Sequence, residues 1–472
     1  MIHLVLNHKY LYEAQTITQL FFFGEKLITI NHLPEKMDGF VVESRLTSTA
    51  VMGFVYKDGV QVSCGQWHLS NTAFYLSEKR MIMLALYYAL QKVVKIHAPW
   101  GALTGIRPSK MIREWLALGK TDEEIIQILS NPFCTHQEKS KLALTVAHAE
   151  NAVTQQIYKH KKNPVGIYIS IPFCPTRCVY CSFNTSDKPA SQSHMQQYVS
   201  AVEKECKEKA ALLSQLGGTV SSIYIGGGTP TVLEPELLET MLNSINESIG
   251  TAPEYTIEAG RPDTLTIEKL KILKNNNATR ITVNPQTLND KTLKTIGRKH
   301  TAADFFKAFN MAREVGFNTI NTDIIAGLPG ETPQDMEKTM EKLATLVPEN
   351  ITVHTLAVKR ASNLRLLIDD YELPNAANTE KMLEITAETC KKMGLAPYYL
   401  YRQKNMVGLF ENVGYSLPQK ECQYNVGMMA ETQTVLGIGA GAVSKFVNKD
   451  LITRAFNLKN VELYITTKET NQ

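Results

Sequence analysis

The sequence has little that would mark a secreted or membrane-spanning protein. Its start, MIHLVLNHKYLYEAQ, lacks the basic-then-apolar order of a signal peptide, and its longest clean apolar run, MIMLALYYAL after Arg80, is too short to span a bilayer. Cysteine is scarce, at eight residues in 472. Five of the eight lie far apart without a repeating spacing, which indicates reduced thiols rather than a disulfide framework: Cys64, Cys134, Cys206, Cys390 and Cys422. We therefore expect a soluble cytoplasmic protein.

Charge and composition leave the function open but bound the size. Lysine and arginine total 50 against 46 aspartates and glutamates, and the net charge of +4 is too small to indicate a nucleic-acid partner by itself. With 44% hydrophobic and 20% charged residues, the chain has the composition of an ordinary globular protein. A length of 472 residues without internal repeats indicates two or three domains.

From Pro164 onward, short β-rich runs alternate with stretches of helical periodicity. Thr332 and Pro333 mark the start of one helix, and Thr301 and Gly316 bound another. Such alternation predicts an α/β fold with a parallel sheet, open or curled. The expected strands cover residues 166–173, 221–228, 254–260, 280–286, 318–330 and 351–358.

The texture of the chain changes on either side of this β/α region, which we place at residues 161–396. Residues 1–160 begin β-rich, continue as helices and end in the polar, basic linker KHKKNP, which predicts an N-terminal α+β domain of unknown role. Residues 397–472 begin with a stretch rich in Tyr, Asn and Gly. We expect this last part to form a C-terminal extension that covers one mouth of the sheet.

The stretch GIYISIPFCPTRCVYCSFN, residues 166–184, places three cysteines directly after a predicted strand. The spacing C-x3-C-x2-C of Cys174, Cys178 and Cys181 lets three thiolates converge on one metal centre. A structural zinc site normally has four ligands, and no Cys or His follows at zinc-ligand spacing. A 4Fe–4S cluster normally uses four cysteines, so three leave one iron open to an outside ligand. The motif predicts a reactive cluster; chance clustering of structural cysteines is the alternative.

This loop resembles that of the radical S-adenosylmethionine (SAM) enzymes, in which an aromatic residue, here Tyr180, usually precedes the last cysteine. The resemblance implies that the open iron is chelated by the amino and carboxylate groups of SAM. It also implies that an electron from the cluster cleaves SAM to methionine and a 5′-deoxyadenosyl radical, which abstracts a hydrogen atom. The implied fold is a partial (β/α)6 barrel of the TIM type, whose active residues lie at the C-terminal ends of the strands.

Special residues stand at those strand ends. GGGTP, Gly226 to Pro230, ends the second strand, where glycines let the backbone approach a ligand's amino and carboxylate groups; a tight turn is the alternative. Glu258 ends the third strand, Gln286 ends the fourth and Asp323 lies within the fifth, all polar where a buried sheet prefers apolar residues. Each alone is more often a structural hydrogen-bonding group, but together they predict a polar pocket.

An ordered set of motifs, over roughly residues 165–445, resembles the oxygen-independent coproporphyrinogen dehydrogenases and their relatives. The motifs that occur in family order are PFCPTRCVYC, YIGGGTPT, IEAGRPD, IGRKH, NTDIIAGLPGET and GIGAGAVS. The stretch ALTGIRPSKMIREW resembles the HemZ-type branch. The implied catalytic residues are Tyr168 and Arg298. Cluster-bound SAM is implied to contact Tyr168, Tyr180, Gly227 and Glu258. A second SAM is implied to contact Gly228, Thr229, Gln286, Arg298, Asp323, Ala357 and Val443.

The reaction that this resemblance implies converts propionate side chains into vinyl groups. A radical removes a hydrogen atom from the β-carbon, CO2 leaves and one electron passes to an acceptor. Two rounds turn coproporphyrinogen III into protoporphyrinogen IX, which implies a porphyrinogen substrate, one or two SAM molecules, an electron donor and an electron acceptor. A substrate with four carboxylates needs cationic anchors, for which the candidates are Arg261, Arg298, Lys359, Arg360 and Arg402.

Two positions depart from the dehydrogenase pattern. Phe183 stands where those enzymes carry a further cysteine, and Ser170 stands where a histidine is frequent. The order Cys181-Ser182-Phe183 is closer to the haem-chaperone relatives, so a haem-binding chaperone on the same fold is one alternative. Its possible axial ligands are His300, His354, Tyr398, Tyr399 and Tyr401.

A radical enzyme that acts on RNA is another alternative. The stretch before residue 120 mixes lysines and arginines with Trp100 and Trp115, a combination used on phosphates and bases, although MIREWLALG also has the pattern of an amphipathic helix. The run GIGAGA is a weak match to a dinucleotide-binding loop, because the helix-like MMAETQTVL precedes it rather than a strand. We expect a close-packed glycine turn there.

Overall fold

The computed structural model describes residues 1–470 apart from 72, 106, 184–189, 360, 367–370, 404–405 and 449–450. The chain divides into two compact units, Met1–Leu144 and Thr145–Gln472. Helix α5 (Gln137–His160) runs through this division, so the first residues of the expected linker are helical. No helix in the described ranges is long and apolar enough to cross a membrane.

The first unit is an α+β structure built on one sheet, as its β-rich start predicted. The sheet order is β2-β1-β3-β4-β5, with β2 and β3 parallel to β1 and the last two pairings antiparallel. A Cβ atom at Gly65 would lie 2.3 Å from the carbonyl oxygen of Ala85, so the absence of a side chain lets a helix pack directly on the sheet. The elements are β1 (Ile2–Leu6), α1 (Leu11–Phe21), β2 (Leu27–Ile30), β3 (Phe40–Leu46), β4 (Ala50–Lys57), β5 (Val60–His68), α2 (Glu78–Leu90), α3 (Pro108–Ala117) and α4 (Asp122–Ser130).

The two tryptophans that suggested an RNA surface are core residues of this unit. Trp100 is 1% exposed and Trp115 is 2% exposed. Helix α3 turns Ile112 and Trp115 inward and is the amphipathic helix that MIREWLALG indicated. Because buried rings cannot stack on bases, the aromatic half of the RNA hypothesis is wrong.

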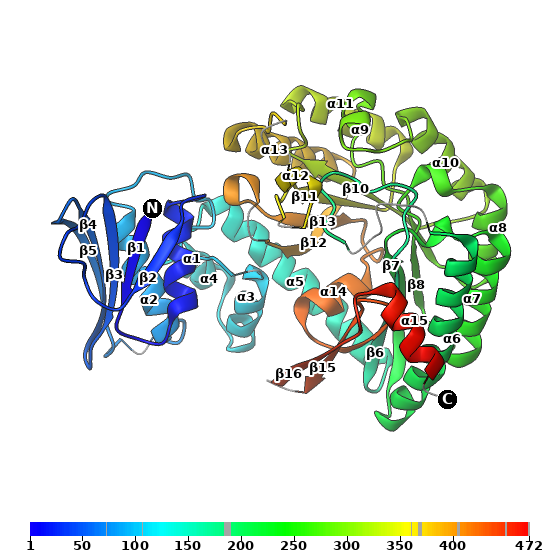
Figure 1. Ribbon diagram of the computed structural model, residues 1–472, viewed down its shortest axis with the longest axis horizontal. Helices are drawn as coiled ribbons and strands as arrows, with labels where there is room; N and C mark the ends of the chain where they lie inside the picture. Colours follow the sequence, from blue (N-terminus) through cyan, green and yellow to red (C-terminus); the bar gives the residue numbers. More distant parts are fainter. Residues whose placement is uncertain are drawn as a thin grey trace. The chain divides into compact units, whose positions relative to one another are not determined.

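The second unit is built on an 11-stranded sheet with the order β12-β13-β11-β10-β9-β8-β7-β6-β14-β15-β16. From β6 to β11 the strands follow one another in chain order and are all parallel, and Figure 1 shows the intervening helices along the outer side of the sheet. This is the succession of β/α units that the sequence predicted. The strands are β6 (Pro164–Ile171), β7 (Thr219–Gly227), β8 (Glu254–Glu258), β9 (Arg280–Thr282), β10 (Ile320–Ala326) and β11 (Asn350–Thr355).

The helices after these strands begin where side chains cap them. Thr301 and Thr332 each form a capping box with the aspartate three residues on, and Pro333 occupies the first turn of its helix. Such caps contribute about 1 kcal/mol each. Both predicted helix starts are confirmed. The helices are α6 (Gln192–Gln215), η1 (Pro230–Val232), α7 (Pro235–Ser248), η2 (Pro262–Thr264), α8 (Ile267–Asn275), α9 (Asp290–Thr295), α10 (Ala302–Glu314), α11 (Pro333–Leu346), α12 (Asn363–Leu366) and α13 (Ala376–Lys392).

The C-terminal residues extend this sheet at both of its ends. One end carries β12 (Ala396–Tyr401) and β13 (Asn412–Ser416); the other carries β14 (Thr434–Ile438), β15 (Val443–Asn448) and β16 (Leu451–Phe456). Helices η4 (Val407–Leu409), α14 (Gln423–Ala430) and α15 (Val461–Thr470) complete the chain. That residues 397–472 act as a unit of their own stays a prediction.

The glycine run GIGAGA begins with the last two residues of β14 and ends directly before β15. Because β14 pairs in parallel with β6, a strand rather than the expected helix leads into the glycine turn. Strand β15 follows it rather than a helix, so the strand–loop–helix order of a dinucleotide site is absent there. A Cβ atom at Gly439 would lie 2.5 Å from Ser170 O, which fits the expected close-packed turn.

Candidate active site

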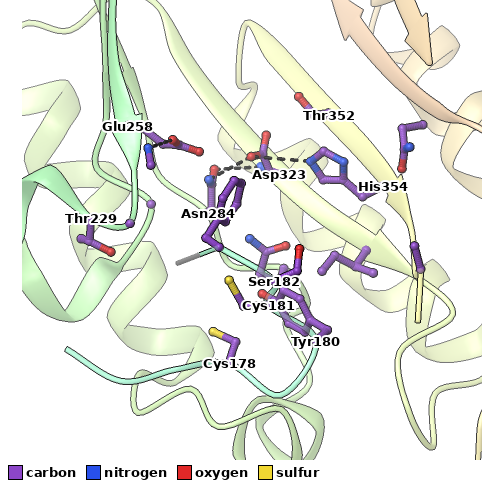
Figure 2. A pocket seen from close by; sticks show the side chains of 18 of the residues that line it. Cys178, Tyr180, Cys181, Ser182, Thr229, Glu258, Asn284, Asp323, Thr352 and His354 are labelled. Atoms are coloured by element: carbon purple, nitrogen blue, oxygen red, sulfur yellow. Dashed lines mark hydrogen bonds and ion pairs between the residues drawn. The ribbon is translucent and has the colours of Figure 1, made fainter. Parts of the chain in front are cut away.

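A cavity of about 350 Å³ lies where the C-terminal ends of β6 to β11 meet. Parallel strands bring their carboxyl ends to the same edge of a sheet, so loops far apart in sequence converge there. Cys174, Cys178 and Cys181, from the loop after β6, line one side of this cavity. Figure 2 shows Cys178 and Cys181 below the polar side chains of the neighbouring strands.

Backbone hydrogen bonds hold the cysteine loop against the glycine run after β7. Gly228 N donates to Ile171 O (2.6 Å) and Thr229 N donates to Phe173 O (2.7 Å). A Cβ atom at Gly228 would lie 2.4 Å from Phe173 O, so this approach requires glycine. Cys174 Sγ lies 3.3 Å from Thr229 Oγ1. The glycines expected to approach a ligand therefore also position the first cysteine.

The thiols of this loop are withdrawn from water and lie beside cations. Burial raises the pKa of the Cys174 thiol to about 11 and also raises the pKa of Cys181. Arg261 Nη1 donates to Cys178 Sγ (3.8 Å), and Lys359 interacts electrostatically with Cys181. A thiol that is neutral when buried ionises when a metal binds it, and nearby cations favour the thiolate.

The arrangement fits a cluster better than a single ion. In the part of the chain that the structure describes, no three His, Cys, Asp or Glu side chains form a group able to hold one metal ion. A 4Fe–4S cluster spreads its thiolate ligands over different irons, so the sulfurs need not meet at one point. Three thiols on one loop, with cationic neighbours and space beside them, are a donor set that suits such a group.

An arc of polar side chains from β8, β10 and the segment after β9 faces the cysteines across the cavity. Glu258 Oε2 accepts from Gly227 N (3.3 Å), and burial together with the charge of Asp323 raises the pKa of Glu258 to about 8. Gln286 adopts a left-handed backbone conformation (φ 67°), and its N–H donates to Asp323 O (3.0 Å). The Gln286 Oε1 atom is buried without a hydrogen-bond partner among the described residues. Such an orphaned acceptor beside a cavity is suited to a ligand donor.

Comparison with known proteins places this site in a family. Residues 168–343 match the radical SAM superfamily. Over 392 residues the chain is 38% identical to the oxygen-independent coproporphyrinogen-III oxidase-like protein HemZ of Bacillus subtilis (strain 168), covering 82% of this chain and 78% of that protein. The chain belongs to this radical SAM family. The family implies a 4Fe–4S cluster and SAM, and the partial-barrel fold predicted from the sequence is the fold of this family.

Further relatives of the family carry different descriptions. The chain is 33% identical over 304 residues to the heme chaperone HemW of Bacillus subtilis (strain 168), covering 63% of this chain and 74% of that one. It is 26% identical over 298 residues to the oxygen-independent coproporphyrinogen III oxidase of Salmonella typhimurium, covering 62% and 64%. The solved coproporphyrinogen III oxidase HemN of Escherichia coli aligns with a TM-score of 0.52 at 23% identity, covering 68% and 73%, and supports the fold.

Most of the residues singled out from the family resemblance line the one cavity. They are Cys174, Cys178, Cys181, Tyr180, Gly227, Gly228, Thr229, Glu258, Gln286, Arg298, Asp323 and Ala357. Two do not line it. Tyr168 packs beside the stacked pair Tyr224 and Tyr424, with its ring centroid 6.3 Å from that of Tyr224 and 6.0 Å from that of Tyr424. Val443 begins β15.

The cationic candidates for substrate anchors differ in where they lie. Arg298 and Lys359 line the cavity, and Arg360 lies outside the described residues. Arg402 is 8% exposed and donates to Leu409 O (2.9 Å). Arg261 lines the cavity but is only 3% exposed, and each of its guanidinium nitrogens has a partner within the protein. Arg261 is therefore a structural member of the site rather than a free anchor.

The sequence motifs did not mark several residues of the cavity, or marked them for another role. Asp323 accepts from Asn284 Nδ2 (2.9 Å) and Asn321 Nδ2 (3.0 Å). His354 Nε2 lies 3.8 Å from Asp323 Oδ2, and its Nδ1 lies 3.3 Å from the hydroxyl of Tyr401 (Figure 2 shows the first contact). The alternation of side chains along a strand puts Asn321 on the same face of β10 as Asp323, and this signal would have found Asn321. His354 lies on β11 and reaches Asp323 only through the pairing of the two strands.

Proposed function

We propose that this protein is a radical SAM oxidoreductase that decarboxylates propionate side chains of coproporphyrinogen III to vinyl groups, in porphyrin biosynthesis. The observation that carries the proposal is the single cavity that joins the cysteine loop to Glu258, Gln286, Arg298 and Asp323. Its support comes from the HemZ and coproporphyrinogen oxidase relatives and from the match of these residues to the family pattern.

In this proposal Cys174, Cys178 and Cys181 hold the cluster. When bound, the cluster supplies the electron that cleaves SAM and so starts hydrogen abstraction. The SAM amino group is a cation, and Glu258, whose carboxyl group accepts from Gly227 N at the cavity, would become its anionic partner by losing a proton when SAM binds. Tyr180 closes the loop side of this SAM site. Tyr168, stacked behind Tyr224, supports the wall rather than touching the reacting atoms.

The polar arc is proposed to hold the second ligand of the reaction. A second SAM would be lined by cavity residues, namely Gly228, Thr229, Gln286, Arg298, Asp323 and Ala357. Val443, which does not line the cavity, would belong to the same site. Lys359 lines the cavity wall and is the cation that we assign to a propionate carboxylate. In each round one hydrogen atom leaves the β-carbon, the carboxyl carbon leaves as CO2 and one electron passes to an acceptor, which balances the formation of a vinyl group.

The test is anaerobic turnover of the reconstituted protein with SAM, a reductant, coproporphyrinogen III and an electron acceptor. We expect both protoporphyrin, measured by fluorescence after oxidation, and 5′-deoxyadenosine, measured by chromatography. Cys178→Ala should abolish both products, whereas Cys64→Ala, at an exposed cysteine of the first unit, should retain them. Formation of 5′-deoxyadenosine without protoporphyrin would leave the radical chemistry intact and refute the substrate.

A second candidate is a haem-binding chaperone. The observation in its favour is Phe183, which is 60% exposed at the cavity and follows Cys181 and Ser182, together with the HemW relative. His300 is unsuited to an axial ligand because its side chain is fully buried, whereas His354 lines the cavity. Tight haem binding that His354→Ala weakens, without SAM turnover in the wild type, would favour this candidate.

A further inference from the structure

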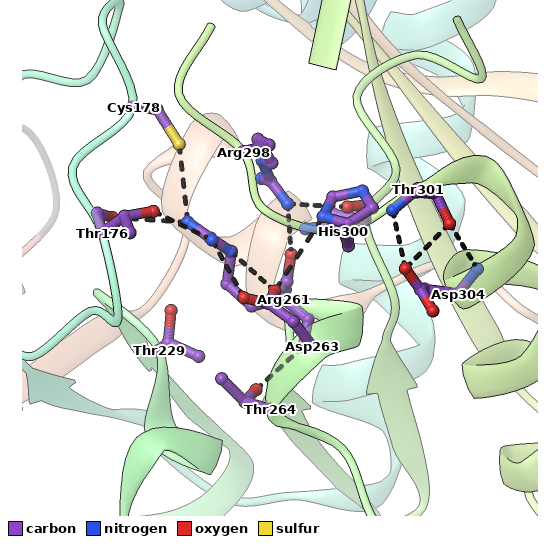
Figure 3. A network of polar contacts seen from close by, with 12 residues as sticks. Thr176, Cys178, Thr229, Arg261, Asp263, Thr264, Arg298, His300, Thr301 and Asp304 are labelled. Carbon is purple, nitrogen blue, oxygen red and sulfur yellow. Dashed lines mark hydrogen bonds and ion pairs between the residues drawn. The ribbon is translucent and has the colours of Figure 1, made fainter. Parts of the chain in front are cut away.

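Arg261 links the cysteine loop to the turn after β8. Its Nε and Nη2 atoms donate to the two carboxylate oxygens of Asp263 (3.1 Å each), and its Nη2 also donates to Thr176 Oγ1 (3.0 Å). The remaining nitrogen, Nη1, donates to Thr176 O (3.3 Å) and to Cys178 Sγ (3.8 Å). Figure 3 shows the guanidinium group between Asp263 on one side and Thr176 and Cys178 on the other.

Local chain geometry fixes the guanidinium in this place. Arg261 precedes η2, and its carbonyl oxygen accepts from Thr264 N and from Thr264 Oγ1. Asp263 is therefore presented two residues after Arg261 as a bidentate partner, the geometry in which a guanidinium is most firmly oriented. Thr176 is held in turn by donation from its hydroxyl to Gly297 O (3.0 Å).

The surroundings of Cys178 carry more positive than negative charge. Arg261 is 3% exposed and Arg298 is 7% exposed, and Arg298 donates to the carbonyl oxygens of Gly260 and Asn284 rather than to a carboxylate. Asp263 is the carboxylate that faces them. Burial and the charge of Arg298 lower the pKa of His300 to about 4, so His300 is neutral near pH 7. Interactions between buried charges are poorly screened by solvent, so this excess acts on the sulfur directly.

A cluster held by three thiolates becomes more negative when it accepts an electron. A fixed cation that donates to one of the thiolate sulfurs stabilises the reduced state more than the oxidised state and raises the reduction potential. We propose that Arg261, oriented by Asp263, sets the reduction potential of the cluster through Cys178. The proposal rests on the proposed ligation by Cys174, Cys178 and Cys181, and it makes Arg261 a positioning residue.

The test is a potentiometric titration of the reconstituted protein, followed by electron paramagnetic resonance of the reduced cluster. Arg261→Gln removes the charge and should lower the equilibrium constant for one-electron reduction about tenfold, which is about 59 mV. Asp263→Asn removes the opposing anion and should shift the potential in the other direction. Arg261→Lys keeps the charge without the fork and should fall between wild type and Arg261→Gln.

Opposite shifts separate an electrostatic role from a structural one, because general disturbance of the loop would move both variants the same way. Arg313→Gln, which removes a carboxylate-paired arginine that contacts Glu349 before β11, is the control and should leave the potential unchanged. Unshifted potentials, or shifts of one sign, would overturn the proposal. If Arg261→Gln holds no cluster, the test compares the reduction potentials of Arg261→Lys and Asp263→Asn, which should again shift in opposite directions. Failure of the wild type to bind a cluster would instead refute the proposed function.

Discussion

Glu258 is a carboxyl group in surroundings that favour its neutral form. It ends β8 at the cavity, and burial, followed by the nearby Asp323 carboxylate, raises its pKa from 4.5 to about 8. The ligand-free protein therefore holds this proton near neutral pH. Binding of a cationic amino group beside Glu258 would favour loss of the proton, which suits the contact proposed for SAM.

This shift predicts a pH-dependent stability. The unfolded chain loses the Glu258 proton above about pH 4.5 while the folded protein keeps it to about pH 8, so the stability contributed by this group is present below the lower value and lost as pH rises through the upper one. Glu258→Gln should remove that dependence. As pH rises from 5.5 to 7.5, the free energy of unfolding of the wild type should therefore fall by about 2 kcal/mol relative to that of Glu258→Gln. The measurement is urea denaturation of the ligand-free proteins at each pH.

Glu239→Gln is the matched control for this measurement, because Glu239 is an exposed residue of α7. Its pH profile should follow that of the wild type. Parallel profiles for wild type and Glu258→Gln would show that the Glu258 carboxyl titrates alike in the folded and unfolded chain, and would contradict the prediction.

For single residues, the sequence predicted the members of the site that belong to recognisable motifs. It missed those that reach the site only because the folded chain brings them there. Glu258 and Asp323 stood out because a charge in a buried strand needs a reason. Asn284 did not, and His354 was considered only as a haem ligand, since single polar residues are common and their partner Asp323 is distant in the chain. The strand position of Tyr168 could not show that its ring would stack on tyrosines of β7 and α14.

At the scale of elements, the site depends on how closely the cysteine loop approaches the glycine run after β7. Gly228→Ala would place a methyl group 2.4 Å from Phe173 O, a backbone atom that cannot move without shifting the loop. We expect destabilisation of about 1–3 kcal/mol, by analogy with overpacked cores, and loss of at least about half of the bound iron and sulfide. Gly105→Ala, where a Cβ atom meets open space, should keep the wild-type iron content. Full iron content in Gly228→Ala would refute this role of the glycine.

A second element contact ties the C-terminal helix to the barrel. Glu205 on α6 is 1% exposed and accepts from Gly439 N (2.8 Å), Asn457 Nδ2 (2.9 Å) and the Tyr464 hydroxyl (2.8 Å), with Lys209 Nζ at 3.6 Å. Glu205→Gln removes the buried charge and replaces one accepting oxygen by an NH2 group, which cannot accept a hydrogen bond from these donors. We expect a loss of about 3 kcal/mol in the free energy of unfolding, measured by urea denaturation.

The same network reaches the entrance of the cysteine loop, because Tyr198 donates to Ser170 O (2.6 Å) and accepts from Ala440 N (2.8 Å). Glu205→Gln should therefore also speed hydrogen exchange in the turn around Gly439. Glu203→Gln, on the same helix but without a hydrogen-bonded network among the described contacts, serves as the control. Equal stability of the two variants would refute the anchoring role of Glu205.

The element pattern of the β/α units was predictable because each strand and helix is local, with its own caps and period. The strands β14 to β16 were not, since β14 is short and gains its place by pairing with β6, far away along the chain. The same holds for β12 and β13, which join the opposite end of the sheet through β11. A local pattern cannot reveal a pairing that only the assembled sheet provides.

At the scale of the whole molecule, the chain divides at a different place from the change in sequence texture. The polar linker KHKKNP suggested a boundary near residue 160, whereas the division of the chain into compact units falls within α5, after Leu144. A long helix can carry a polar, basic last turn and still continue from one unit to the next, because cations are favourable near a helix C-terminus. Composition alone therefore could not locate the division.

This division has a spectroscopic consequence, because all three tryptophans lie in the first unit: Trp67, Trp100 and Trp115. The proposed ligand site lies wholly in the second. Tryptophan fluorescence in rising urea thus follows residues 1–144, while hydrogen exchange of peptides from β7 follows the barrel. SAM added to the reconstituted protein at about a hundred times its dissociation constant should stabilise β7 against opening by about 2.7 kcal/mol.

The tryptophan transition and the exchange of β4 should stay unchanged by SAM, since a ligand stabilises only the unit whose folded state binds it. Cys178→Ala supplies the control, because without a complete cluster SAM should no longer protect β7. A shift of the tryptophan transition equal to that of β7 would show that the two units unfold together. The first unit would then be part of the cooperative structure that carries the radical site, and variants in its core, such as Trp115→Phe, should change SAM binding as well as stability.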